Sequence, residues 1–174
     1  MTRTMNIWFG CTGRTTYSQC LYCKAYHKIG IKCPEKAYRY LYSKWKHSGG
    51  FKSTKTLYNL WFAKKVIKKT GVVILVESPG NVWRLEEAGI HNSLGIFGCE
   101  FSDEQKEFLD KTGAMTIIAL LDNDEAGQLG IESIYNKCWK DYKIVTPTIS
   151  KNDIGDMTIE EVKNITELQE FINV

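Results

Sequence analysis

The chain of 174 residues is long enough for one well-buried domain with a smaller appendage, and it is too short for a multi-module enzyme. Hydrophobic residues make up 43% and charged residues 25%, which is ordinary for a globular protein, and no apolar run is long enough to cross a bilayer. The formal net charge of +3 hides an asymmetry: residues 1–71 contain 15 of the 23 Lys and Arg with a single acid, Glu35, whereas the remainder contains 19 acids.

This division of charge predicts a basic surface for a polyanion beside an acidic part that holds metal. A lysine-rich face that is simply solvated is the alternative, and charge alone does not separate the two. The first residues, MTRTMNIWFG, lack the extended apolar stretch of a secretory signal. We therefore expect a cytoplasmic protein of a bacterial cell or a phage-infected host, with reduced thiols and no membrane association.

A cluster of candidate metal ligands lies near the start of the chain. Cys20, Cys23, His27 and Cys33 follow the spacing C-x2-C-x3-H-x5-C, which is close to that of a compact zinc knuckle. A structural Zn²⁺ would order a segment that is too short to build its own core. The alternative is a basic loop with reduced cysteines and no metal, because the spacing is not a standard one.

Aromatic residues interleave with lysines in the stretch YRYLYSKWKHSGGF. Aromatic faces stack on unpaired bases while cations follow the phosphate backbone, so this pattern suits single-stranded DNA. The same aromatics could instead form the core of a small subdomain. We predict that residues 1–71 are a basic, aromatic-rich subdomain with a candidate zinc site, and that residues 72–174 are a second domain.

The pattern from residue 57 onward predicts alternating helices and strands. A helix is expected at 57–69, and the apolar run VVILVE at 72–77 predicts a strand covered on both faces. Pro79 suits the first turn of a helix that ends near Ala88, before Gly89. A second strand is expected at 92–97, and Ser102 with Gln105 forms a capping box that opens a helix to about Lys111.

The second half continues this alternation. TIIALLD at 116–122 is the clearest strand, followed by a helix at about 125–139 and a fourth strand at 142–149. Thr158 with Glu161, and Thr166 with Gln169, predict capping boxes of two short helices. Alternating strands and helices favour parallel pairing with right-handed crossovers, so the predicted fold class is α/β with an open, mostly parallel sheet flanked by helices.

Acids follow three of the predicted strands. Glu77 closes the first strand, Asp122 and Asp124 close the third, and Asp153 and Asp156 follow the fourth. Because ligands of an open parallel sheet bind beyond the carboxyl ends of its strands, these acids predict one acidic pocket. Gathered carboxylates repel each other, and a hard cation such as Mg²⁺ or Mn²⁺ relieves the repulsion. A single Asp could instead cap the following helix.

The order of these motifs resembles the Toprim domain, which bacterial-type primases, topoisomerases, small nucleases and recombination proteins share. The family pattern is a strand ending in Glu-Gly, a strand leading to Gly, and a strand ending in Asp-x-Asp followed by Ala-Gly. The chain has Glu77-Ser78, then GIFG at 95–98, then DNDEAG at 122–127. The likeness runs from about Val72 to Val162.

Segments upstream extend the resemblance to DNA primases of the bacterial and phage type. FGCTGR at 9–14, KAYRYLYS at 36–43 and LYNLWFAKK at 57–65 are similar to segments of the primase polymerase core. The resemblance covers the later part of such a core, without a separate N-terminal zinc-ribbon domain or a helicase.

The resemblance implies a role for each matching residue. Glu77 would be a general acid/base or would organise metal, and Asp122 and Asp124 would bind Mg²⁺. Asp153 and Asp156 match the downstream acidic motif. The residues that would hold template or nucleotide phosphates are Arg14, Lys36 and Lys55.

The implied function is Mg²⁺-dependent nucleotidyl transfer that makes RNA primers from NTPs on a single-stranded DNA template, in company with a replicative helicase or other replication subunits. Two departures from the family pattern are Ser78, where Gly is expected, and Asn81, where many primases have Asp. These departures keep two rivals open, a Toprim nuclease and a catalytically silent nucleic-acid-binding subunit.

Overall fold

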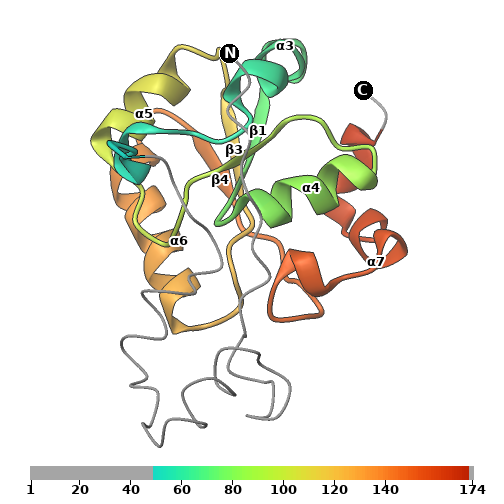
Figure 1. Ribbon diagram of the computed structural model, residues 1–174. Helices are drawn as coiled ribbons and strands as arrows, with labels where there is room; N and C mark the ends of the chain where they lie inside the picture. The colour runs from blue at the N-terminus through green and yellow to red at the C-terminus, as the bar shows by residue number, and fades with distance from the viewer. Residues whose placement is uncertain (1–48, 173–174) are drawn as a thin grey trace, which may run out of the picture. The chain divides into compact units, whose positions relative to one another are not determined.

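The computed structural model describes residues 49–172, and the compact unit that contains the sheet begins at Lys52. Four parallel strands form the sheet in the order β2-β1-β3-β4: β1 (Val72–Val76), β2 (Ser93–Gly95), β3 (Thr116–Ala119) and β4 (Lys143–Val145). The predicted α/β fold with an open parallel sheet is confirmed (Figure 1).

Helices cover both faces of the sheet (Figure 1). The first face packs against three helices and the second against two helices and a 3-10 turn. On the first face these are α3 (Leu60–Thr70), α5 (Asp103–Asp110) and α6 (Glu125–Cys138). On the second they are α4 (Pro79–Glu87), α7 (Ile159–Lys163) and η3 (Thr166–Phe171).

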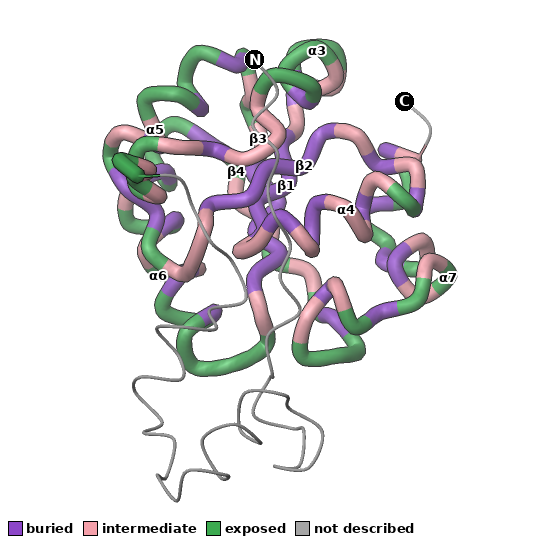
Figure 2. The backbone as a smooth tube through the Cα atoms, viewed as in Figure 1, coloured by how far each residue is buried: buried purple, intermediate pink, exposed green. Residues whose placement is uncertain are grey.

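The two central strands explain this three-layer arrangement. Successive side chains of a strand point to opposite faces, so in β1 Val73 and Leu75 enter the first core while Ile74 and Val76 enter the second. All four are fully buried. A run of apolar residues without alternation therefore fits a strand that is covered on both sides, as Figure 2 shows for the centre of the sheet.

Two of the three predicted capping boxes are confirmed. Ser102 accepts a hydrogen bond from the backbone N–H of Gln105, and Thr158 accepts one from Glu161, with the reciprocal side-chain bonds present in both. The prediction for Thr166 is wrong, because η3 is a 3-10 helix whose N-cap is Ile165 and no side chain caps it.

The strands are shorter than predicted. Apolar residues stay buried beyond the last paired residue, so the apolar run in the sequence is longer than the strand itself. Leu120 and Leu121 are buried but lie beyond β3, and β2 is followed by Phe97 and Gly98, whose φ values of 63° and 138° turn the chain away. Helix α3 begins at Leu60 rather than Leu57, since Asn59 is left-handed (φ 70°) and Tyr58 bridges to Gly95.

Residues 52–71 belong to the same compact unit as the sheet. Ala63 and Ile67 of α3 are fully buried in the first core, and Gly71 in the left-handed conformation (φ 71°) ends the helix just before β1. The domain boundary expected after residue 71 therefore falls inside a packed segment.

Gln105 fastens the segment before α3 to the sheet. The Gln105 side chain is fully buried, and its Nε2 donates to the carbonyl oxygens of Ser53, Thr56 and Ile96 at 3.1, 3.0 and 2.9 Å. Its Oε1 accepts from the Ser102 N–H at 3.0 Å. One side chain thus joins η1 (Ser53–Lys55), α5 and the end of β2.

Among residues 49–172, no helix is long and apolar enough to span a membrane.

We predict that Gln105→Ala lowers the free energy of unfolding by about 2–4 kcal/mol, because it leaves buried carbonyl groups unpaired and opens a cavity. Glu107→Ala is the matched control on an exposed face of α5 and should change it by less than about 0.5 kcal/mol. Urea unfolding followed by far-UV circular dichroism gives both values. Equal effects of the two substitutions would contradict the anchoring role of Gln105.

Candidate active site

The acids predicted to meet at the strand ends do come together at the carboxyl edge of the sheet. Glu77 follows β1 directly, and its Oε1 accepts a hydrogen bond from the backbone N–H of Asp122, which follows β3, at 3.3 Å. The neighbouring strands β1 and β3 pair in parallel from Val72 with Thr116 to Leu75 with Ala119. This register places both strand ends at the same level.

A short chain of hydrogen bonds orients the Asp122 carboxylate. Asn81 of α4 is only 2% exposed, and its Nδ2 donates to Asp122 Oδ1 at 3.4 Å. The Ser78 hydroxyl donates to Asn81 Oδ1 at 2.5 Å, which leaves the amide nitrogen to face Asp122. Ser78 also caps α4, so the two departures from the family pattern act together in holding Asp122.

The DNDEAG motif has a structural requirement at its last residue. A Cβ added at Gly127 would lie 1.8 Å from the carbonyl oxygen of Asp122, so only glycine lets the start of α6 pass this close to the loop. Asp124 caps α6 by accepting a hydrogen bond from the Gly127 N–H at 2.9 Å. Asp124 therefore caps α6 through one oxygen, and its second carboxylate oxygen has no hydrogen bond within the described residues, so capping does not exclude a role in binding metal.

Asp153 belongs to a loop that is tied to the end of β3. Its Oδ1 accepts from the Gly155 N–H at 2.7 Å, and this bond caps η2 (Ile154–Asp156). The backbone N–H of Asn123 donates to the carbonyl of Asn152 at 2.7 Å, which joins the two loops. Asp156 is exposed at the end of η2.

Electrostatics shows that these acids act on one another. The pKa of Asp122 is raised to about 7, chiefly by burial and then by the negative charges of Asp153 and Glu77. The hydrogen bond from Asn81 lowers this pKa, and the charge of Asp124 raises it slightly further. Burial also raises the pKa of Glu77, with further contributions from Asp124 and Asp153, against the lowering by the Asp122 N–H. Four carboxyl groups therefore share one electrostatic environment.

No basic side chain of residues 49–172 neutralises this group. The ion pairs of this part of the chain join Lys55, Arg84, His91, Lys106, Lys137 and Lys151 to other acids, and none includes Glu77, Asp122, Asp124 or Asp153. Within the described residues, the excess negative charge at the strand ends is therefore not balanced by an ion pair.

The donor set suits a hard divalent cation such as Mg²⁺ or Mn²⁺, because all four groups offer carboxylate oxygens. Within residues 49–172, no three His, Cys, Asp or Glu side chains already converge as a ligand set. Mg²⁺ is commonly held by one or two carboxylates with waters and substrate phosphates, and Asp122 with its neighbours could supply such ligands. The residues present therefore fit this cation.

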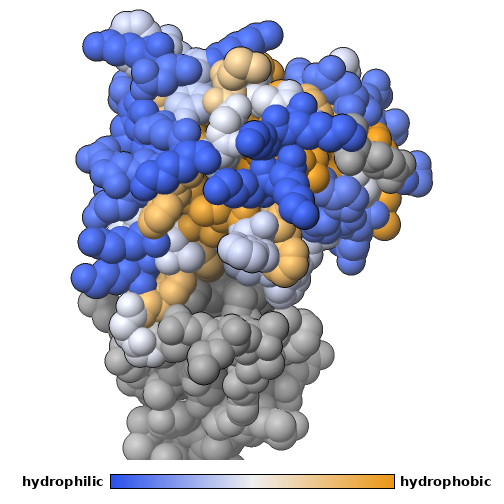
Figure 3. All heavy atoms as spheres, turned by 90° about the horizontal axis from the view of Figure 1, so that it is seen from above, coloured by the Kyte–Doolittle hydropathy of each residue, from blue (hydrophilic) through white to orange (hydrophobic). Residues whose placement is uncertain are grey.

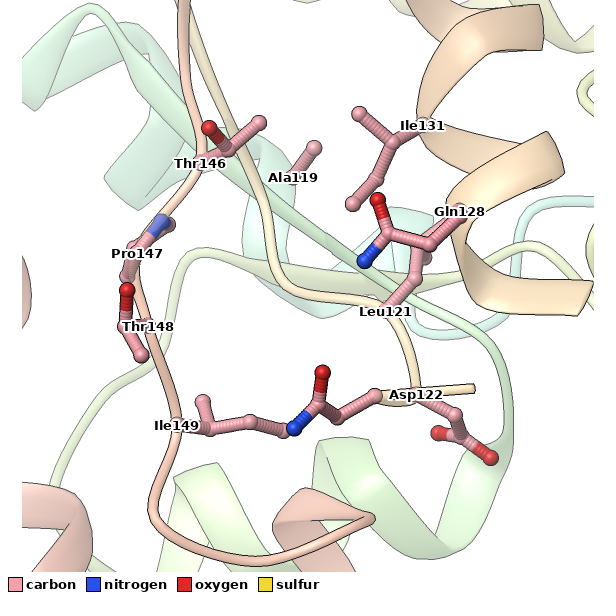
Figure 4. Close-up of a pocket in the computed structure, with 10 residues that line it drawn as sticks. Ala119, Leu121, Asp122, Gln128, Ile131, Thr146, Pro147, Thr148 and Ile149 are labelled. Atoms are coloured by element: carbon pink, nitrogen blue, oxygen red, sulfur yellow. The ribbon is translucent and has the colours of Figure 1, made fainter. Parts of the chain in front are cut away.

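A pocket of about 200 Å³ is lined by Asp122 and lies beside the acidic group. Ala119, Leu121, Ile131 and Ile149 give it an apolar part, and Gln128, Thr146 and Thr148 give it a polar part. Figure 4 shows the Asp122 carboxylate turned away from the space between Thr148 and Gln128. Asp122 and Asn123 also line this pocket, so the loop after β3 borders it while the Asp122 carboxylate points elsewhere.

Of the remaining predicted site residues, the structure describes Lys55, which does not pair with these acids. Lys55 lies on η1, where its Nζ forms an exposed ion pair with Glu104 at 3.4 Å. Outside the described residues lie the phosphate-binding candidates Arg14 and Lys36 and the zinc candidates Cys20, Cys23, His27 and Cys33.

The sequence reasoning missed the positioning roles of Ser78 and Asn123. Ser78 sits directly after a strand and before Pro79, which is the signal of an N-cap and was available. The bond from Asn123 to Asn152 links two backbone groups far apart in sequence, and no sequence pattern indicates it.

Comparison with known proteins agrees with this arrangement. Residues 71–147 match the model of the Toprim domain. A DNA primase of Chlamydia pneumoniae is 30% identical over 88 residues, which is 51% of this chain and 15% of that protein. A DNA primase of Aquifex aeolicus is 35% identical over 83 residues, or 48% of this chain and 16% of the relative.

Solved structures give the same result for the fold. The Aquifex aeolicus primase with its zinc-binding and RNA polymerase domains aligns with a TM-score of 0.57 and 26% identity, covering 68% of this chain and 31% of that one. The RNA polymerase domain of Mycobacterium tuberculosis primase aligns with a TM-score of 0.55 and 17% identity, covering 73% and 43%.

The chain spans about 15% of the length of the curated relatives that it matches. The matched region includes the strands that end in Glu77 and in Asp122 and Asp124, together with the glycine that α6 requires. Residues 71–147 therefore form a Toprim domain, and it is of the kind found in DnaG-type DNA primases.

Proposed function

We propose that this chain catalyses nucleotidyl transfer with Mg²⁺ or Mn²⁺ and extends RNA primers from NTPs on single-stranded DNA. The observation that carries the proposal is the meeting of Glu77 and Asp122 at the carboxyl edge of the sheet, where the Asp122 N–H donates to Glu77 Oε1 at 3.3 Å. The charges of Asp153, Glu77 and Asp124 help to raise the pKa of Asp122 there. Carboxylates that share a charge environment without a basic partner are suited to binding a divalent cation. The likeness to DNA primases supplies the class of reaction.

In such a reaction the 3′-hydroxyl oxygen of the primer bonds to the α-phosphorus of an NTP, and pyrophosphate leaves with the bonding electrons. A bound divalent cation would neutralise charge on the triphosphate and lower the pKa of the attacking hydroxyl. Asp122 and Asp124, with Asp153, are the residues that would hold it, and Asp156 is a further candidate.

Glu77 is the candidate for accepting the hydroxyl proton. Burial raises its pKa, which brings the group closer to the pH at which it both accepts and releases a proton. Its Oε1 is held by the Asp122 N–H, so the carboxylate has a fixed position beside the cation ligands. Asn81 and Ser78 would act as positioning residues, since they orient the Asp122 carboxylate.

The proposed partners follow from the reaction. Solved primase structures include one in complex with double-stranded DNA and one bound to single-stranded DNA, and by analogy the template here would be DNA. Arg14, Lys36 and Lys55 would contact phosphates of template or NTP. A replicative helicase or another replication subunit is the proposed protein partner, and Cys20, Cys23, His27 and Cys33 are the proposed ligands of a structural Zn²⁺.

Two other functions use the same residues. In a nuclease the acids would direct water instead of a primer hydroxyl at a phosphodiester. A catalytically silent binding subunit is favoured by Asn81, an amide at a position where many primases have a carboxylate. The decisive experiment incubates the chain with single-stranded DNA and Mg²⁺, with and without labelled NTPs. Primer synthesis, cleavage without NTPs, and binding alone identify the three functions in turn.

We predict that Asp122→Asn lowers metal-dependent turnover by about 100-fold or more, because several kcal/mol of charge stabilisation depend on this carboxylate. Glu132→Gln removes an exposed acid of α6 and is the matched control with unchanged turnover. Magnesium titration of the initial rate measures both variants. Full activity of Asp122→Asn would exclude Asp122 from the catalytic group.

We predict that the metal-free protein loses stability as pH rises from about 4 to about 7. The folded state keeps a proton on Asp122 up to a pKa of about 7, whereas the unfolded chain releases it near the ordinary value of 3.8, so rising pH favours unfolding across this window. Urea midpoints measured in EDTA test this. Asp122→Asn should flatten the pH dependence, and an unchanged slope in that variant would count against the shifted pKa.

We predict that Cys23→Ser lowers the zinc content of the purified protein from about one ion per chain towards zero, because three ligands hold Zn²⁺ much less tightly than four. Cys99→Ser is the control, since Cys99 lies outside the cluster and forms no disulfide. Elemental analysis measures both. Equal zinc content in the two variants, or none in the unmodified chain, would contradict the zinc site.

A further inference from the structure

Helix α3 exposes two neighbouring aromatic side chains. Trp61 is 88% exposed and Phe62 is 78% exposed, the highest values among the large hydrophobic residues of the described part of the chain. Removing such rings from water would be favourable, and burying them is not needed for the fold, because Ala63 and Ile67 supply the buried face of the helix. An exposed Trp beside an exposed Phe is a typical feature of a binding surface.

Lysines continue the same face of the helix. Lys65 lies one turn after Trp61 and Phe62, and Lys68 and Lys69 lie one turn further, so helical spacing places all five on the side opposite Ala63 and Ile67. We call Trp61, Phe62, Lys65, Lys68 and Lys69 the α3 face. Figure 1 shows α3 on the outside of the sheet, and Figure 2 shows exposed residues along it.

The lysines of the α3 face have no acidic partner within the described residues. Lys106, by contrast, pairs with Asp110 at 3.2 Å and with Asp141 at 2.8 Å, and Lys137 pairs with Asp103. The first turn of α3 contains no acid. Positive charge is therefore concentrated along one helix without compensation, which suits a polyanion.

The surface extends beyond α3 at its C-terminal end. Lys68 lies next to Gly113, where its Cγ is 3.9 Å from the position of an added Cβ, and Met115 nearby is 70% exposed. Lys111 places its Nζ 5.6 Å from the ring centroid of the partly exposed Phe108. Figure 3 looks down on the end of the molecule where α3 lies and shows hydrophilic side chains around a smaller apolar area.

We propose that the α3 face is a binding site for single-stranded nucleic acid. Unpaired bases offer flat faces on which Trp61 and Phe62 can stack, and the phosphates that follow can be neutralised by Lys65, Lys68 and Lys69. A protein partner fits less well, because lysine is depleted in protein–protein interfaces and three lysines of this face would have to be desolvated. A duplex also fits less well, since its bases are already stacked.

The position of α3 relative to the acids gives the site a direction. The Tyr58 N–H, just before α3, donates to the Gly95 carbonyl at 2.8 Å. The first turn of α3, which contains Trp61 and Phe62, therefore begins close to the carboxyl end of the edge strand β2. The lysines follow toward the start of β1, which is the amino end of this strand and lies away from the carboxyl ends that the acids follow. A strand on the α3 face would therefore run away from the acidic edge. Binding there does not depend on the acids being catalytic.

The experiment measures binding of a fluorescein-labelled oligothymidylate to the full chain by fluorescence anisotropy, in EDTA and without NTPs. Trp61→Ala/Phe62→Ala should weaken binding by about tenfold or more, because stacking on each base is lost. Trp139→Ala is the matched control: Trp139 is 54% exposed on another helix end and has Lys140 over its ring at 5.3 Å. It should change the affinity by less than about twofold.

The lysines are tested by the salt dependence of the same affinity. Lys65→Gln/Lys68→Gln should reduce the slope of log K against log salt by about 1.4, since each phosphate contact on a single strand contributes about 0.7. Lys140→Gln/Lys143→Gln makes the same change of charge elsewhere and should leave the slope unchanged. Circular dichroism verifies that each variant is folded.

Several results would overturn the site. One is an affinity that falls equally in Trp61→Ala/Phe62→Ala and Trp139→Ala, or in neither. Another is a duplex of equal length that binds more tightly than the single strand and responds to the same substitutions. Self-association that Trp61→Ala/Phe62→Ala abolishes, with oligonucleotide affinity unchanged, would assign the face to a second copy of the chain. Asp122→Asn should bind the oligonucleotide without loss, so a failed catalytic proposal and a failed binding proposal are distinguishable.

Discussion

The placement of negative charge depends on two buried parallel strands. β1 and β3 pair in register, and both are covered on both faces, so their ends cannot move apart without exposing apolar side chains. Glu77 and Asp122 follow these strands and are held by a hydrogen bond between the Glu77 carboxylate and the Asp122 N–H. Hydrophobic burial therefore supplies the free energy that keeps mutually repelling acids together. The raised pKa values of both groups are the consequence of that constraint.

Repulsion at the strand ends can be relieved in two ways, by a proton or by a cation. With a pKa of about 7, Asp122 is balanced between its charged and neutral forms near neutral pH. A proton and a cation therefore compete for the same carboxylate oxygen atoms. Asn81 shifts this balance, because an amide that donates to the carboxylate stabilises its charged form without adding charge of its own. A carboxylate in place of Asn81 would increase the repulsion, which suggests that the amide suits a site with fewer cation ligands.

Much of this arrangement follows from the sequence, for identifiable reasons. VVILVE and TIIALLD lack alternation, which indicates strands buried on both faces, and acids after such strands must meet at one edge of a parallel sheet. The strand lengths could not be predicted from the sequence, because Leu120 and Leu121 are buried in the cores without pairing in the sheet. The bond between Asn81 and Asp122 did not follow either, since it joins side chains 41 positions apart and depends on how α4 packs. Thr166 has the letters of a capping box, but the chain there winds into a 3-10 helix, where the expected geometry is not formed.

The described ion pairs explain why the charge asymmetry of the sequence persists as two separate surfaces. Acids of the helices, such as Glu104 and Asp110, neutralise lysines close to them, whereas the strand-end acids and the α3 lysines remain without partners in this part of the chain. Had Lys65 or Lys68 reached Asp122, an ion pair would have formed and lowered its pKa, and neither charge would have been available to a ligand. The sheet keeps them apart, because the lysines run along α3 toward the start of β1 while the acids lie at the strands' carboxyl ends. Opposite charges that the fold prevents from meeting can each bind an external partner, a cation at one place and a nucleic-acid backbone at the other.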